Sequence, residues 1–344
     1  MIERPKAMAV GAWGALRRHP LQSAIAGLVI AGGMATAAVS GTSASGQSGD
    51  GYGTTPTTSS TTTSSSTTTT TTTVSAGSGG PPTVPAPMRG YFVSGADGSI
   101  FAYNAPYGGG PNTLPGGPGS TVVGVSQDAA GGYFVVGENG AVFAYNGAVW
   151  KGGPNQLPGG PGTPIVGIAA TPPGGYFVAG ANGAVFAYNG AVYIDGANTL
   201  PGGPGTPIVG ITATQTGGYY EVGANGAVFA YGAPYAGGPN TLPGGPGTPI
   251  VGITAMPGGG YLVIGKNGVI WPYGGATVPG EPSTLNGGTG PGTPIVGISS
   301  TPDGGYYVVG EDGSVYAYDT PYGGGPNTLN SGAGPGTRIT GIAG

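Results

Sequence analysis

The residues best suited to chemistry are four charged side chains that interrupt an otherwise repeated sequence: Lys151, Asp195, Glu221 and Glu281. Two carboxylates that flank a glycosidic bond can cleave it, one as general acid and the other as base or nucleophile. Glu221 could form such a pair with Asp195 or Glu281. The alternative is unrelated change in loops, together with one acid that faces a central channel.

Glu221 is the most unusual of the four because it stands in GYYEVG, where the other repeats carry apolar residues. A carboxyl in such a position is expected to be buried with a raised pKa, to be paired with a cation or to face a channel. The repeat itself does not require any of the four residues. We therefore take all four as candidate ligand-binding positions.

The composition excludes several classes of catalysis. The chain has no cysteine, and its single histidine is His19, so residues 89–344 contain neither. Thiolate nucleophiles, Ser-His-Asp triads and His-ligated or Cys-ligated metals are therefore excluded from this region. Its acids are scattered, whereas calcium needs several oxygen ligands close together. We expect no enzyme activity and no metal.

Residues 260–267 come close to a phosphate-binding loop, with Gly260, Gly265 and Lys266 at the matching positions. Asn267, however, replaces the hydroxyl residue that such a loop uses to hold magnesium. The same columns in other repeats read GYFVVGEN and GYFVAGAN, so Lys266 is interpreted as a turn residue. We expect no cofactor.

Charge is scarce and mostly negative. Residues 89–344 hold four basic and ten acidic residues, which gives a net charge near −6. A nucleic-acid-binding surface needs a cluster of basic residues. The sequence therefore predicts no nucleic-acid partner.

The first 88 residues predict export and a spacer. Four basic residues precede an apolar run at 21–40, so residues 1–40 are either a cleaved signal peptide or a single apolar membrane-anchoring helix. Residues 41–88, rich in Ser and Thr, are expected to be a disordered linker, either O-glycosylated or an unmodified spacer. The predicted location is extracellular or at the cell surface, with membrane contact only through residues 21–40 if uncleaved.

Residues 89–344 consist of six repeats of about 42–45 residues, each marked by a Gly-Tyr pair. In one repeat, residues 164–171, 175–180 and 184–188 are predicted strands, and Asn182-Gly183 forms a tight turn that needs positive φ. The weaker segment AVYIDGANTL is interpreted as a short outer strand. Three or four antiparallel strands per repeat are the content of one propeller blade.

The two ends of this region predict how the blades close into a ring. The first hairpin, Gly90–Tyr103, lacks a preceding IVG-type strand, and the last such strand, 338–342, lacks a hairpin. If these two pair, six complete blades result. The prediction is an all-β, six-bladed β-propeller. A β-solenoid or a row of independent hairpins would leave both segments unpaired.

The repeat P-[IV]-V-G-I-x-x-T-P-x-G-G-Y-x-V-x-x-[DN]-G-x-V-[FY]-A-Y resembles the Gly-Tyr type β-propeller repeats of secreted and surface actinobacterial proteins, broadly akin to NHL and WD propellers. The resemblance implies a propeller and supplies no catalytic motif. Two tyrosine columns run through all six repeats, as sugar-stacking platforms or as packing residues.

The predicted function is a non-enzymatic binding module, monomeric, for a cell-wall polysaccharide or a surface protein. The alternatives are a carbohydrate-active hydrolase or lyase that uses the acidic residues, and a purely structural surface protein.

Overall fold

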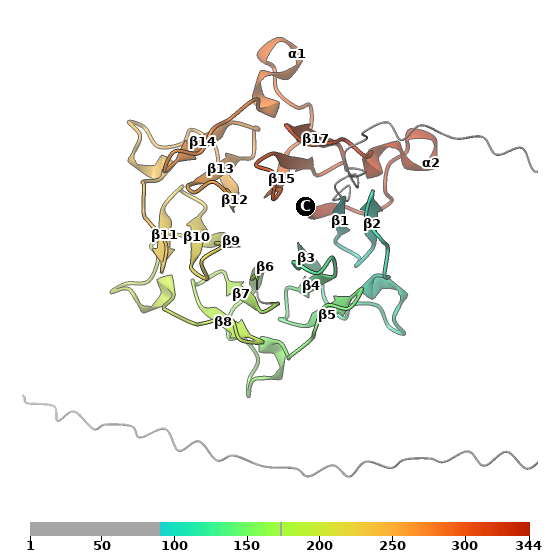
Figure 1. Ribbon diagram of the computed structural model, residues 1–344, viewed down its shortest axis with the longest axis vertical. Coiled ribbons are helices and arrows are strands. Elements are labelled where there is room, and N and C mark those ends of the chain that lie inside the picture. Colours follow the sequence, from blue (N-terminus) through green and yellow to red (C-terminus); the bar gives the residue numbers. More distant parts are fainter. Residues whose placement is uncertain (1–89, 173) are drawn as a thin grey trace, which may run out of the picture. The chain divides into compact units, whose positions relative to one another are not determined.

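The computed structural model describes residues 90–172 and 174–344, so the expectations for residues 1–40 and 41–88 lie outside the described residues. The described chain is all-β, with six three-stranded antiparallel sheets around a central axis (Figure 1). This arrangement is consistent with the predicted six-bladed β-propeller, and each sheet is called a blade below. No helix within these ranges is long and apolar enough to cross a bilayer.

Each blade has an inner, a middle and an outer strand, with the inner strands nearest the axis (Figure 1). Blade 1 contains β18 (Ile339–Ala343), β1 (Tyr91–Gly95) and β2 (Ile100–Tyr103). Blades 2 to 4 contain β3 (Val122–Gln127), β4 (Tyr133–Gly137), β5 (Val142–Tyr145), β6 (Ile165–Ala170), β7 (Tyr176–Gly180), β8 (Val185–Tyr188), β9 (Ile208–Ala213), β10 (Tyr219–Gly223) and β11 (Val228–Tyr231). Blades 5 and 6 contain β12 (Ile250–Ala255), β13 (Tyr261–Gly265), β14 (Ile270–Tyr273), β15 (Ile295–Ser300), β16 (Tyr306–Gly310) and β17 (Val315–Tyr318).

Blade 1 joins the two ends of the described chain. Its inner strand β18 pairs antiparallel with β1, with Val93 opposite Ile342 and Ser94 opposite Gly341. The predicted pairing of the last strand with the first hairpin is therefore confirmed. Without β18, one edge of β1 would face solvent with unpaired backbone groups. Pairing with β18 gives these groups their ladder hydrogen bonds.

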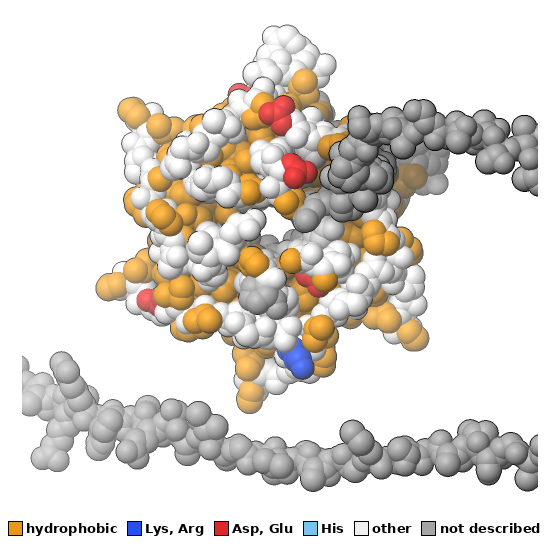
Figure 2. All heavy atoms as spheres, in the orientation of Figure 1, with side chains coloured by type: hydrophobic (Ala, Val, Ile, Leu, Met, Phe, Trp, Pro, Cys, Tyr) orange, Lys and Arg blue, Asp and Glu red, His pale blue; other side chains and the backbone are white. Residues whose placement is uncertain are grey.

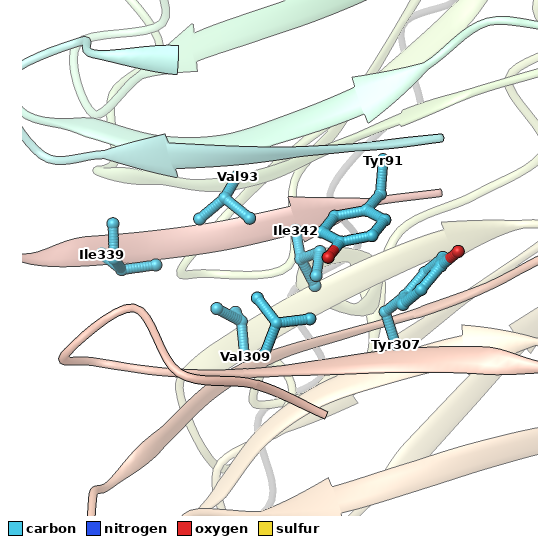
Figure 3. Packing of buried hydrophobic residues seen from close by; sticks show 7 residues of the cluster. Tyr91, Val93, Tyr307, Val309, Ile339 and Ile342 are labelled. Carbon is cyan, nitrogen blue, oxygen red and sulfur yellow. The ribbon is translucent and has the colours of Figure 1, made fainter. Parts of the chain in front are cut away.

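The core lies between neighbouring blades, because the middle strand of every blade is buried on both faces. Figure 3 shows one such junction, between blades 6 and 1, where Val93 packs among Val309, Ile339 and Ile342. Strands covered on both sides have continuous apolar runs. This accounts for sequences such as YFVVG, which do not alternate.

The turn between the middle and outer strands differs in detail from the prediction. Gly137 N–H donates to the Ala141 carbonyl at 2.9 Å, so the loop has three residues, Glu138 to Gly140. Of the Asn-Gly pair only the glycine has positive φ, +86° at Gly140. Asn139 instead accepts the Ala141 N–H through its side chain at 3.0 Å. Asn or Asp recurs here because its side chain closes the turn.

The outer strand predicted for the weak segment is wrong. This segment is an extended loop that ends in a one-turn 3-10 helix, as in η3 (Ala197–Thr199). In the equivalent segment after blade 2, Gly152 has φ of +114° and Pro154 has no N–H, and both interrupt the regular ladder that a further strand would need. The equivalent helices are η1 (Pro111–Thr113), η2 (Pro154–Gln156), η4 (Pro239–Thr241), η5 (Pro282–Thr284) and η6 (Pro326–Thr328), with single turns α1 (Leu285–Gly288) and α2 (Leu329–Gly332) after the last two.

Candidate functional site

Glu221 is fully buried in the middle strand of blade 4, with 0% of its surface exposed. It lies opposite Ile211 in β9 and Phe229 in β11. The other five blades place valine at this position: Val93, Val135, Val178, Val263 and Val308. Burial raises the pKa of the Glu221 carboxyl to about 7, opposed by one backbone hydrogen bond. Of the environments expected for this residue, the structure shows the buried one.

The hydrogen bond to Glu221 comes from the loop after blade 3. Ala197 N–H donates to Glu221 Oε2 at 3.0 Å. Five blades have proline at the Ala197 position, which carries no N–H: Pro111, Pro154, Pro239, Pro282 and Pro326. The junction that buries the Glu221 carboxyl is thus also the junction where a backbone N–H replaces proline and can donate to it.

Asp195 lies two residues before Ala197 in the same loop. Its carboxylate accepts hydrogen bonds from Thr199 Oγ1 at 2.7 Å and from Gly196 N–H at 2.8 Å. These bonds lower the pKa of the Asp195 carboxyl, and the bond from Thr199 has the largest effect. The structure therefore brings Asp195 and Glu221 to one junction, between blades 3 and 4.

Lys151 and Glu281 do not join this pair. Lys151 lies exposed after blade 2, and its backbone N–H donates to Tyr176 Oη at 3.0 Å. Glu281 lies after blade 5, where it accepts the Ile270 N–H at 2.7 Å and a bond from Ser283 Oγ. Within the described ranges no group of three or more His, Cys, Asp or Glu side chains could hold a metal ion.

The two tyrosine columns recognised in the sequence are packing residues. The first column, which begins each middle strand, is fully buried, and Tyr133 Oη donates to the Gly109 carbonyl at 2.6 Å. Burial raises the pKa of Tyr261 in this column to about 12. The second column packs on the first, as in the Tyr133–Tyr145 pair with ring centroids 5.3 Å apart. Neither column offers the open platforms that sugar stacking would need.

A third aromatic column, missed in the sequence, is exposed. It lies in the loops after the outer strands, and between 49% and 59% of each side chain is exposed: Tyr107, Trp150, Tyr193, Tyr235 and Tyr322. In the loop after blade 5, the equivalent position is occupied by Val278. The available signal was an aromatic residue among Pro, Val and Gly outside any strand pattern. The structure thus presents an exposed aromatic side chain at the same position in five of the six repeats.

These aromatic residues lie in loops that bond to the middle strand of the next blade. Next to Trp150, the Lys151 N–H bonds to Tyr176, the first residue of its middle strand. The turns that precede the middle strands line a hollow of about 490 Å³ with residues such as Asp128, Thr171 and Thr301. We call the surface formed by the five exposed aromatic residues the aromatic face.

The inner strands hold the hollow together through hydroxyl groups. Ser126 Oγ accepts the Ala170 N–H of the next blade at 2.9 Å, and Thr254 Oγ1 accepts the Ser300 N–H at 2.9 Å. Asp128 closes its own turn by accepting the N–H groups of Ala130 and Gly132. The hollow is thus lined mainly by uncharged polar groups. Figure 2 shows the same scarcity of charge on the face in view.

Comparison with known proteins gives structural neighbours only. No family model and no curated protein matches the chain. Solved structures that resemble it include virginiamycin B lyase from Staphylococcus aureus, with 13% identity, 58% of this chain and 70% of that chain covered, and a TM-score of 0.37. A streptogramin B lyase has 15% identity, coverage of 69% and 76%, and a TM-score of 0.38. YCF48 bound to D1 peptide has 14% identity, with 67% of this chain and 75% of that chain covered, and a TM-score of 0.40. Similarity at this level carries no argument about function.

Proposed function

We propose that residues 90–344 form a non-enzymatic binding module whose aromatic face contacts a cell-wall polysaccharide or a surface protein. The observation that carries this proposal is the exposed aromatic column. Tyrosine and tryptophan combine a flat apolar face with a polar group, which suits sugar rings and the centres of protein interfaces. Five copies around a ring allow several weak contacts to act together.

The proposal includes the setting of the module. The export segment and linker predicted in residues 1–88 would carry the domain, as a monomer, outside the cell or onto its surface. The resemblance to Gly-Tyr propeller repeats of secreted actinobacterial proteins agrees with that location. Both statements rest on the sequence.

The alternative of a hydrolase or lyase has less support. The predicted enzyme would use Glu221 with a second acid, and a glycoside hydrolase needs both carboxyl groups within reach of its substrate. Glu221 has no exposed surface, and Glu281 is bonded within blade 5. Asp195 alone lacks a partner acid for the reaction. The observations therefore favour binding.

The test is a pull-down of the full chain with purified cell-wall material and with surface protein extract, followed by measurement of the Kd. Replacing Tyr107, Trp150, Tyr235 and Tyr322 by alanine should weaken binding at least about tenfold, because each lost contact at a hot spot costs about 1 kcal/mol or more. A matched control replaces four other exposed apolar residues, Leu114, Leu157, Leu242 and Leu329, which are 38–42% exposed. Equal loss in both variants, or no binding by the folded native chain, would refute the proposal.

A further inference from the structure

The junction between blades 3 and 4 departs from the repeat at two places that touch. Glu221 replaces a valine that belongs to the apolar junction in the other blades, and Ala197 replaces a proline and donates to Glu221. Proline at position 197 would leave Glu221 without this bond. Two unrelated departures from the repeat, one in a strand and one in a loop, would not be expected to meet in one hydrogen bond. The pair is therefore a built feature of the junction between blades 3 and 4.

The bond fixes a loop of the aromatic face. Residues 191–197 run from Ala191 past Tyr193 to Ala197, and the Asp195 N–H also donates to Tyr219 Oη at 3.0 Å. Ile194 N–H donates to the same hydroxyl at 3.2 Å. The segment that follows Tyr193, a member of the exposed column, is thus held by Tyr219 and by Glu221.

We propose that Glu221 is a proton-dependent positioning residue, which holds the Tyr193 loop against blade 4 when neutral and releases it when charged. Release of the loop should also weaken ligand contact at this blade as pH rises, and only this consequence rests on the proposed function. The positioning itself requires no ligand.

The surroundings of Glu221 offer a charged carboxylate little support. Its Oε1 is buried and has no hydrogen-bond partner among the described residues. The opposing sheet, blade 3, contributes apolar residues to this junction, including Phe177, Ala179 and Val185. A buried charge without a cation is costly, and the structure gains by rearranging to admit water.

The ionisable groups near Glu221 are phenols and one acid, on three elements. Tyr219 shares its strand, Tyr231 lies on β11, and Tyr193 and Asp195 lie in the loop. The phenols are neutral at neutral pH, because burial is the first cause that raises the pKa of each. Asp195 is an anion there and would repel a second negative charge. Only the Ala197 N–H favours the charged form of Glu221, and burial outweighs that single hydrogen bond.

The experiment follows the Ala197 amide by NMR in the full chain from about pH 5 to about pH 9, a range that spans the titration of a carboxyl raised to neutral pH. We expect its shift to titrate with a midpoint near 7. Above that midpoint, amides of residues 193–197 should exchange about tenfold faster than in Glu221→Gln at the same pH. Glutamine keeps an acceptor for Ala197 and cannot ionise, so its loop should stay protected throughout.

Two further variants make the result specific. Asp195→Gly restores the residue found at this position in the other blades and should leave the titration of Ala197 in place. Glu221→Val combined with Ala197→Pro restores the repeat and should abolish pH-dependent exchange in the loop. A native Ala197 amide that does not titrate, or one that titrates equally in Glu221→Gln, overturns the proposal. These outcomes are independent of whether any ligand is found.

Discussion

Single residues that break the repeat carry most of the specific information in this molecule. Glu221 could be singled out from the sequence because five other copies define what belongs at its position. Its hydrogen bond with Ala197 could not, because that bond joins two blades across 24 positions of the chain. Lys151 and Glu281 also break the pattern, yet Lys151 bonds to Tyr176 through its backbone alone and Glu281 bonds within blade 5. A spacing argument cannot distinguish such positions from a shared site.

Restoring the repeat at both positions, Glu221→Val with Ala197→Pro, should stabilise the domain more at pH 8 than at pH 4. The carboxyl has a pKa of about 7 when folded and an ordinary value of 4.5. The folded state therefore binds the proton more tightly, and native stability falls as pH rises from about 4.5 through about 7. The difference corresponds to about 3 kcal/mol at high pH.

Denaturant unfolding of the native chain and the double variant at several pH values measures this effect. The gap in the free energy of unfolding should widen between about pH 5 and pH 8 and then stay constant, as linkage requires once the group is ionised in both states. A gap that is independent of pH would show that the Glu221 carboxyl has the same pKa in the folded and unfolded states, as a solvated carboxyl would.

Among the structural elements, the strands were the easiest to predict and the loops the hardest. The three predicted strands of the 164–188 repeat correspond to β6, β7 and β8 within a residue or two. Their apolar runs and turn residues are local signals. The predicted outer strand failed because the loop bonds to the tyrosine hydroxyl of the next blade, as Lys151 does to Tyr176, which is a contact between blades.

The hairpin turns give a test of why glycine recurs in them. Gly140 has φ of +86°, and an added Cβ would lie 2.9 Å from the Asn155 N. Gly217 has φ of +90° with nothing within 4 Å of an added Cβ. Gly217→Ala should cost about 1–2 kcal/mol from the left-handed backbone alone. Gly140→Ala should cost about 1–3 kcal/mol more, because the turn and helix η2 must move apart.

Thermal or denaturant unfolding of the two glycine variants measures the difference. Both should remain folded with unchanged far-ultraviolet circular dichroism. Equal losses of stability would mean that backbone conformation alone selects glycine in these turns and that the close approach of η2 plays no part.

As a whole, the domain is a ring whose fold the repeated residues determine and whose exposed aromatic column suggests its use. The count of hairpins and IVG-type strands predicted six sheets and the pairing of β18 with β1. The aromatic face could not be predicted, because exposure depends on where the loop lies between blades. Tyr133 opens a strand pattern and Tyr107 lies outside one, but that difference alone does not say that Tyr107 is exposed.

The most direct test of the aromatic face is acrylamide quenching of Trp150 fluorescence, taken as the difference between the native full chain and Trp150→Phe. Trp150 is 49% exposed, so its emission should be readily quenched in the free protein. Saturation with the cell-wall or protein ligand recovered by pull-down should reduce that quenching several-fold, since a residue in a binding interface is shielded from water. Unchanged quenching of Trp150 in the saturated complex would contradict the assignment of the aromatic face as the binding surface.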